Sequence, residues 1–131
     1  MKAFYLAVML GLTVAGCASA DGGATTLKAD ADLASDTGVY KVRAVPVAPV
    51  KRGANDFSVR VVIPEGAKVV GATAFMPAHG HSSDPPSITQ AADGSFRVDH
   101  LVLFMGGRWE ITLSVAGGAK EDQVRFGVDV P

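Results

Sequence analysis

The chain has 131 residues, of which 48% are hydrophobic, and its formal net charge is −1. This length and composition fit one modest folded domain. So small a charge, with basic residues scattered along the chain, argues against nucleic acid or an electrostatic membrane surface as a partner.

Residues 1–16 are predicted to be a lipoprotein signal peptide. A lysine near the start is followed by an apolar run that is too short to cross a bilayer as a helix. The run ends in Val14-Ala15-Gly16-Cys17, which resembles the bacterial lipobox cut by signal peptidase II. This resemblance implies cleavage before Cys17 and a durable anchor of several acyl chains, such as palmitate, on that residue. The alternative is an ordinary secretory signal, because Ala18-Ser19-Ala20 also looks like a small-residue cleavage site.

Cys17 is the only cysteine, so a lipid on its sulfur leaves the folded domain without a thiol or a disulfide. A cysteine redox pair and a thiolate metal ligand are then both excluded. The next residue is Ala18 and not Asp, which by analogy with enterobacterial sorting favours the periplasmic face of the outer membrane.

Residues 17–36 are predicted to be a flexible tether. They are rich in Ala, Asp, Gly, Ser and Thr, and such a segment has too few large apolar groups to offset its ordering entropy. About 20 residues of this kind behave as a coil that spans roughly 25 Å.

Residues 37–131 are predicted to be an all-β domain, because no window has a helical period and turn residues recur at short intervals. The expected strands are 40–47, 57–63, 68–75, 87–90, 96–104, 108–115 and 123–130. Turns are expected at 52–55, 64–67, 93–94, 106–107 and 116–121, and a polar loop at 80–86. About seven such strands are typical of an immunoglobulin-like antiparallel β-sandwich, with a small closed barrel as the alternative.

The expected strand 96–104 changes its alternation midway. Phe96 and Val98 share one parity, whereas Leu101, Leu103 and Met105 share the other. A β-bulge near Asp99-His100 would place both sets on the core face. Trp109 is expected to be the largest single piece of that core.

The candidate functional residues lie between positions 76 and 105. Only two Met and three His remain after removal of the leader, and all five fall in this span. Met76 ends one expected strand, His79 and His81 flank a glycine that lets the backbone turn, and Met105 follows another strand. If these strand ends are neighbours, two imidazoles and two thioethers meet at one rim. This set suits copper, and its thioethers suit Cu(I) in particular, whereas zinc is the weaker choice.

Two further residues are more distant candidates for the same copper site. Asp84 follows His81 closely enough to bind the metal or to orient an imidazole. His100 completes the set of histidines and is expected at the bulge.

Several blocks of the sequence, taken in order, resemble the YtkA-like domain, which is related to FixH-type domains. They are Asn55-Asp56-Phe57, Gly71-Ala72, Met76-Pro77-Ala78-His79-Gly80-His81, Asp93-Gly94-Ser95-Phe96 and Phe104-Met105-Gly106-Gly107-Arg108-Trp109-Glu110. The resemblance covers about residues 38–131, although the family commonly has Pro where this chain has Gly106. It implies an immunoglobulin-like sandwich on an exported or membrane-attached bacterial protein. The association of FixH-type relatives with maturation of metal-dependent oxidases implies a link to copper.

The same Met and His residues also have a purely structural interpretation. Met76 and Met105 would fill the core, and His79 and His81 would cap backbone groups of a polar loop. No enzyme is predicted, because the chain has no nucleophile elbow, no phosphate-binding glycine loop and no paired-carboxylate spacing.

Two functions therefore stay open. In the first, a lipid-anchored periplasmic domain binds copper or delivers it to a copper-receiving envelope protein. In the second, a non-catalytic module without metal binds another protein of the cell envelope.

Overall fold

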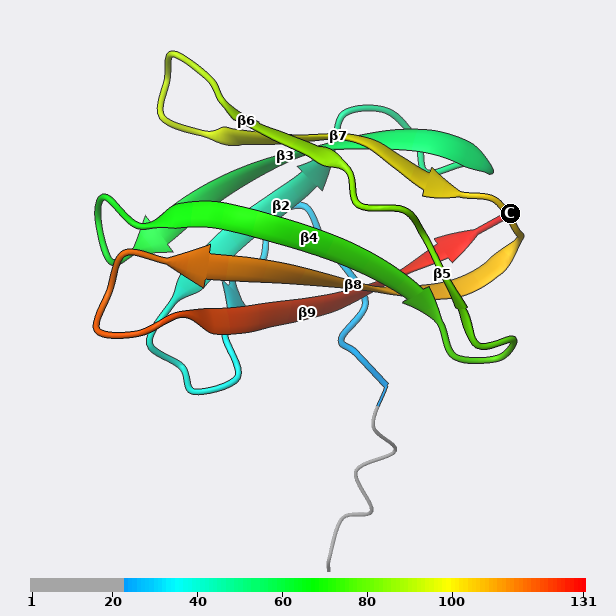
Figure 1. The fold of residues 1–131 in the computed structure, drawn as a ribbon, viewed down its shortest axis with the longest axis horizontal. Coiled ribbons are helices and arrows are strands. Elements are labelled where there is room, and N and C mark those ends of the chain that lie inside the picture. Colours follow the sequence, from blue (N-terminus) through cyan, green and yellow to red (C-terminus); the bar gives the residue numbers. More distant parts are fainter. Residues whose placement is uncertain (1–22) are drawn as a thin grey trace, which may run out of the picture.

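The computed structural model of the chain describes residues 23–131. Within this range, nine strands form two antiparallel sheets that pack face to face (Figure 1). One sheet has the order β1-β2-β3-β7-β6 and the other the order β5-β4-β8-β9. The strands are β1 (Leu33–Ala34), β2 (Lys41–Pro46), β3 (Gly53–Ile63), β4 (Lys68–Met76), β5 (His81–Ser82), β6 (Ser87–Gln90), β7 (Phe96–Leu103), β8 (Gly107–Ala116) and β9 (Asp122–Val130). The predicted β-sandwich is confirmed, and the sheets do not close into one barrel.

The core lies between the two sheets and follows from the alternation of side chains along each strand. In β8, Trp109, Ile111, Leu113 and Val115 are at most 1% exposed, while the residues between them are only half-buried. Successive side chains of a strand point to opposite faces, so one apolar set fills the core. All described core residues, and the partly buried hydrophobic residues packed against them, lie within residues 27–130. No helix among the described residues is long and apolar enough to cross a membrane.

The predicted bulge in β7 is confirmed. Val98 and Leu101 are both buried, although an unbroken alternation would expose one of them. Between them, Asp99 and His100 face a single residue of β3, Asp56. The backbone N–H of His100 donates a hydrogen bond of 2.8 Å to the Asp56 carboxylate, and His100 has a φ of 65°.

Two short segments differ from the sequence prediction. The turn expected at 52–55 lies earlier, because β3 already begins at Gly53. The Asn55 side chain accepts a hydrogen bond of 2.9 Å from the Lys51 N–H and donates one of 2.7 Å to the Lys51 carbonyl, so it closes the preceding loop. The polar loop expected at 80–86 contains β5, which pairs with the end of β4.

Residues 24–36, predicted as part of a flexible tether over 17–36, lie against the sandwich. The Gly127 N–H donates to the Thr25 carbonyl (2.8 Å), and the Leu27 N–H donates to the Gly127 carbonyl (2.9 Å). The segment then crosses to the other sheet, where β1 pairs with β2. The polar composition predicted flexibility, but backbone bonds to β9 do not depend on side chains, so composition does not reveal them.

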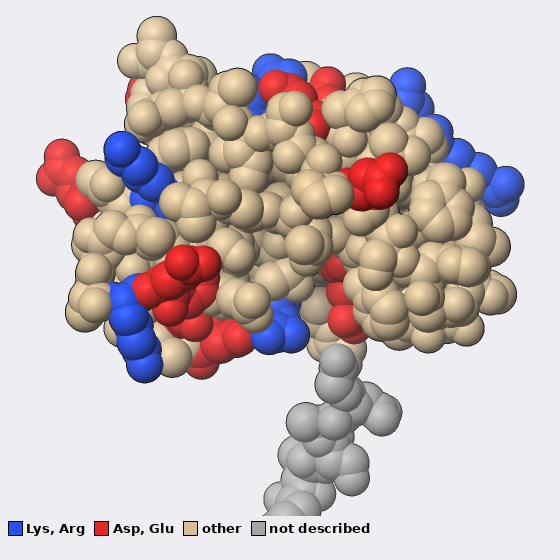
Figure 2. Space-filling view, in the orientation of Figure 1, with Lys and Arg blue, Asp and Glu red and all other residues tan. Residues whose placement is uncertain are grey.

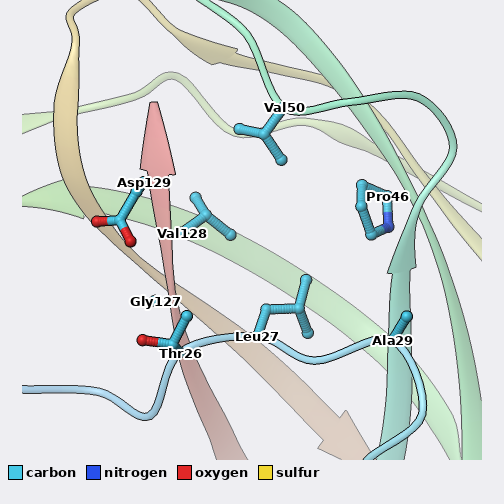
Figure 3. Close-up of a pocket in the computed structure, with 8 residues that line it drawn as sticks. All are labelled: Thr26, Leu27, Ala29, Pro46, Val50, Gly127, Val128 and Asp129. Carbon is cyan, nitrogen blue, oxygen red and sulfur yellow. The ribbon is translucent and has the colours of Figure 1, made fainter. Parts of the chain in front are cut away.

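An arginine and a glycine fix the start of this segment. The Arg108 guanidinium donates a hydrogen bond of 2.7 Å to the Ala24 carbonyl, and it covers Gly127, where any side chain would collide with it. Beside the segment lies a mostly apolar cavity of about 380 Å³ (Figure 3). It is lined by Thr26, Leu27, Ala29, Pro46, Val50, Gly127, Val128 and Asp129. The N-terminal segment thus covers the side of the sandwich between β2 and β9.

The β8–β9 turn is fastened to the segment that enters β2. Tyr40 is fully buried, and its hydroxyl donates to the Lys120 carbonyl (2.5 Å) and accepts from the Gly118 N–H (2.8 Å). The hydroxyl and the N–H of Thr37 both donate to the Asp122 carboxylate, at 2.6 and 2.9 Å, and hold the pKa of Asp122 well below its usual range. This end of the sandwich is closed by polar bonds, and the candidate site lies at the opposite end.

Candidate metal-binding rim

The segments that the sequence singles out meet at one end of the sandwich. β4 and β7 end there and β8 begins there (Figure 1). We call this end the rim, made of the β4–β5 turn with β5 (residues 77–82) and the β7–β8 connection (residues 104–106). The pairing of Phe75 with Glu110 brings the end of β4 beside the start of β8. A Cβ atom at Gly107 would stand 3.3 Å from the Met76 methyl carbon, so the two segments are in contact.

The register of β5 places His81 at the open end of the core. His81 pairs with Met76, and residues directly opposite each other in an antiparallel pair share one face. Met76 faces the core, so the His81 side chain is directed to the same side, where its ring meets that of Phe104 at a centroid distance of 5.6 Å. The His79 ring stacks beside His81, with centroids 6.1 Å apart and planes inclined by 22°.

Both imidazoles are exposed to solvent. Within residues 23–131, the imidazole nitrogens of His79 and His81 make no hydrogen bond, so they do not cap the backbone of this loop. A neutral imidazole has one nitrogen with a free lone pair, which is the atom that binds a metal. These two side chains are therefore available as ligands.

Met105 lies on the same rim, beside Phe104. Its side chain is partly buried against the core, and its carbonyl accepts a hydrogen bond of 2.9 Å from the Trp109 indole N–H. Phe104 contacts the His81 ring on one side and the Trp109 ring on the other. The structure thus brings the segment of His79 and His81 together with the segment of Met105.

Met76 is placed differently from Met105. Its side chain is 1% exposed and ranks among the largest fully buried side chains of the core. Of the two predicted thioethers, Met105 is partly exposed at the rim, whereas Met76 is fully buried in the core.

The two more distant candidates are outside the rim segments. Asp84 is exposed in the loop after β5, and its carbonyl accepts a hydrogen bond of 3.1 Å from the Ser83 hydroxyl. His100 sits exposed at the bulge in the five-stranded sheet. Residues 101–103 separate it from the rim, and a strand of that length spans roughly 13 Å from His100 to Phe104. The predicted lipid-attachment residue, Cys17, lies outside the described residues.

The rim segments contain no charged residue of their own, but the Arg52 guanidinium lies against Gly106. The stretches 69–83 and 100–107 contain no Lys, Arg, Asp or Glu. Figure 2 shows a largely uncharged surface over β5 and the β4–β5 turn. Among the described residues, no group of three or more His, Cys, Asp or Glu is arranged to hold a metal ion. The donors available at the rim are neutral imidazoles and a thioether, a set that suits a soft ion better than a carboxylate-bound divalent one.

Phe104 is not among the site residues that the sequence predicts. Trp109 was predicted as core and Phe104 as the end of a strand. The contacts of Phe104 with Trp109 and with His81 join separate segments of the chain, so the local pattern does not reveal them. The available signal is that Phe104, Met105 and Trp109 lie in one block around a glycine turn.

The sequence model of the YtkA-like family matches residues 34–114. The match covers more than half of the chain and contains both rim segments. No curated protein matches the chain, and no solved structure does. The predicted resemblance to the YtkA-like domain is thereby confirmed, over residues 34–114 and not over the whole of the expected range 38–131. The chain belongs to the YtkA-like family.

Proposed function

We propose that this YtkA-like domain binds Cu(I) at its rim through His79, His81 and Met105, and that it holds copper or passes it on within the bacterial cell envelope. The observation that carries the proposal is the contact of the His81 ring with the Phe104 ring, whose centroids are 5.6 Å apart. This contact brings β5 beside the β7–β8 connection, which carries Met105 and links the two sheets.

The ligand set favours the monovalent ion. Imidazole and thioether ligands are neutral, and the rim segments carry no carboxylate to offset the charge of a divalent ion. Thioethers also select Cu(I) by their softness. His79 and His81 are exposed, so an ion bound between them stays accessible to a receiving protein, and this suits transfer.

Replacing both histidines tests the proposal. In a protein of residues 18–131, the double replacement His79→Ala with His81→Ala is expected to weaken Cu(I) affinity at least about 100-fold. Replacing a residue that only hydrogen-bonds to a metal ligand already lowers metal affinity about 10- to 100-fold. The measurement is an anaerobic competition with a chromogenic Cu(I) chelator. Affinity of the unaltered protein should also fall on acidification, because a protonated imidazole cannot bind a metal.

His100→Ala is the matched control, since it removes an exposed histidine that lies away from the rim. Its Cu(I) affinity should equal that of the unaltered protein. The proposal fails if the double variant binds as tightly as the unaltered protein, or if the unaltered protein binds more weakly than about millimolar.

A second function, an interaction module of the envelope without metal, is favoured by a different observation. Phe75 and Phe104 are large apolar side chains that are 42% and 46% exposed near the rim. Exposed aromatic residues are common in protein interfaces. Capture of an envelope partner that survives the double histidine replacement, together with absent copper binding, would support this second function.

We further propose that the domain is held at the membrane by lipid on Cys17, on the periplasmic face of the outer membrane. Ala24 is bonded to the sandwich through Arg108, so seven residues of chain, at most about 25 Å, would join the lipid to the domain. Cys17→Ser should move the protein from the outer-membrane fraction to the soluble fraction and abolish labelling with palmitate. Unchanged membrane association of this variant would contradict the anchor.

A further inference from the structure

We propose that Phe104 is a positioning residue for the copper site, which sets the orientation of the His81 imidazole at the rim. This inference rests on the proposed function, because it assigns a role to a side chain that is not itself a ligand. Its basis is a chain of contacts that leads from the buried core to the exposed histidines.

The chain of contacts begins at Trp109. This residue is 0% exposed, and its indole N–H is bonded to the Met105 carbonyl at 2.9 Å, so both its ring and the Met105 backbone are fixed. The Phe104 ring stands edge-on to Trp109, with centroids 5.2 Å apart and planes at 79°. The same Phe104 ring meets His81 at 5.6 Å and 65°. Both are edge-to-face geometries that aromatic pairs prefer.

His81 depends on this contact because little else restrains it. β5 has two residues and pairs only with the last two residues of β4. Within the described part of the chain, no hydrogen bond holds the His81 imidazole. A side chain that is free before binding must be ordered by the metal, and that ordering reduces affinity. Phe104 therefore orders His81 in advance, next to the segment that carries Met105.

The exposure of Phe104 agrees with this role. Phe104 is 46% exposed, so it leaves much apolar surface in water, which is unfavourable. A smaller apolar residue would also contact Trp109 and would expose less of this surface.

The test compares Phe104→Leu with Phe104→Tyr in residues 18–131, with Phe75→Leu as the matched control. Phe75 is a similarly exposed aromatic residue, and no aromatic contact within the described residues joins its ring to His79 or His81. Phe104→Leu keeps apolar contact with Trp109 but removes the ring, and it should weaken Cu(I) affinity roughly 3- to 10-fold, the cost of ordering one side chain. Phe104→Tyr should restore the affinity, and Phe75→Leu should leave it unchanged.

A second measurement on the metal-free protein separates this inference from the copper proposal. The His81 ring protons of the unaltered protein should show a ring-current shift and cross-relaxation with Phe104 in NMR spectra, and both should vanish in Phe104→Leu. If the unaltered protein binds no Cu(I), the proposed function fails, and these NMR signals alone decide whether Phe104 orients His81. Equal affinity of Phe104→Leu and the unaltered protein, or unchanged His81 signals, would overturn the inference.

Discussion

Replacing Trp109 by alanine is expected to lower the free energy of unfolding by about 3–5 kcal/mol. The side chain is 0% exposed and is the largest in the core, so its removal leaves a cavity between the two sheets. A small domain has a total stability of about 5–15 kcal/mol, so the loss is a large share of it. Denaturant unfolding followed by circular dichroism measures the change, since the variant lacks the only tryptophan.

Phe75→Ala is the control for this prediction. Phe75 is also aromatic, but it is 42% exposed on the outer face of β4, and its truncation should change stability by about 1 kcal/mol or less. If Trp109→Ala lowers the free energy of unfolding no more than Phe75→Ala does, then Trp109 does not hold the sheets together and cannot fix Phe104 or Met105.

Met76 and Met105 are expected to respond in opposite ways to substitution. Met76→Ala should lower the free energy of unfolding by about 2–5 kcal/mol, because the side chain is fully buried. Met76→Leu should cost less than about 1.5 kcal/mol, since it nearly conserves volume, and should leave Cu(I) affinity unchanged. Met105→Leu should keep stability within the same limit but weaken Cu(I) affinity, because it removes the thioether that is accessible at the rim.

The comparison of the two leucine variants distinguishes a core methionine from a ligand. Both changes remove a sulfur and keep an apolar side chain, so any difference in copper affinity reports on the sulfur. Chelator competition and thermal unfolding of both proteins provide the measurements. A loss of affinity in Met76→Leu as large as in Met105→Leu would show that Met76 reaches the metal, and the rim would then have to open for binding.

The bulge shows what a local pattern can reveal. The change of parity between Val98 and Leu101 predicted it, because a period of two residues cannot keep both on one face without an extra residue. Regular alternation of apolar and polar residues, which is also a local pattern, predicted β8 and β9. The segment 24–36 shows the opposite case, since its composition predicted a tether and its bonds to Gly127 join residues about a hundred positions apart.

The sequence by itself determined that the chain is all-β, where its strands alternate and which imidazoles and thioethers it offers, because these depend on residue type and on periods of a few residues. The tertiary structure alone decided that Met76 is buried while Met105 reaches the rim, since this depends on the pairing of β4 with β8. It also placed His81 opposite Met76 and against Phe104. These contacts join segments that are far apart in the sequence, and strand register and packing of the sandwich set their geometry, which no short stretch of sequence encodes.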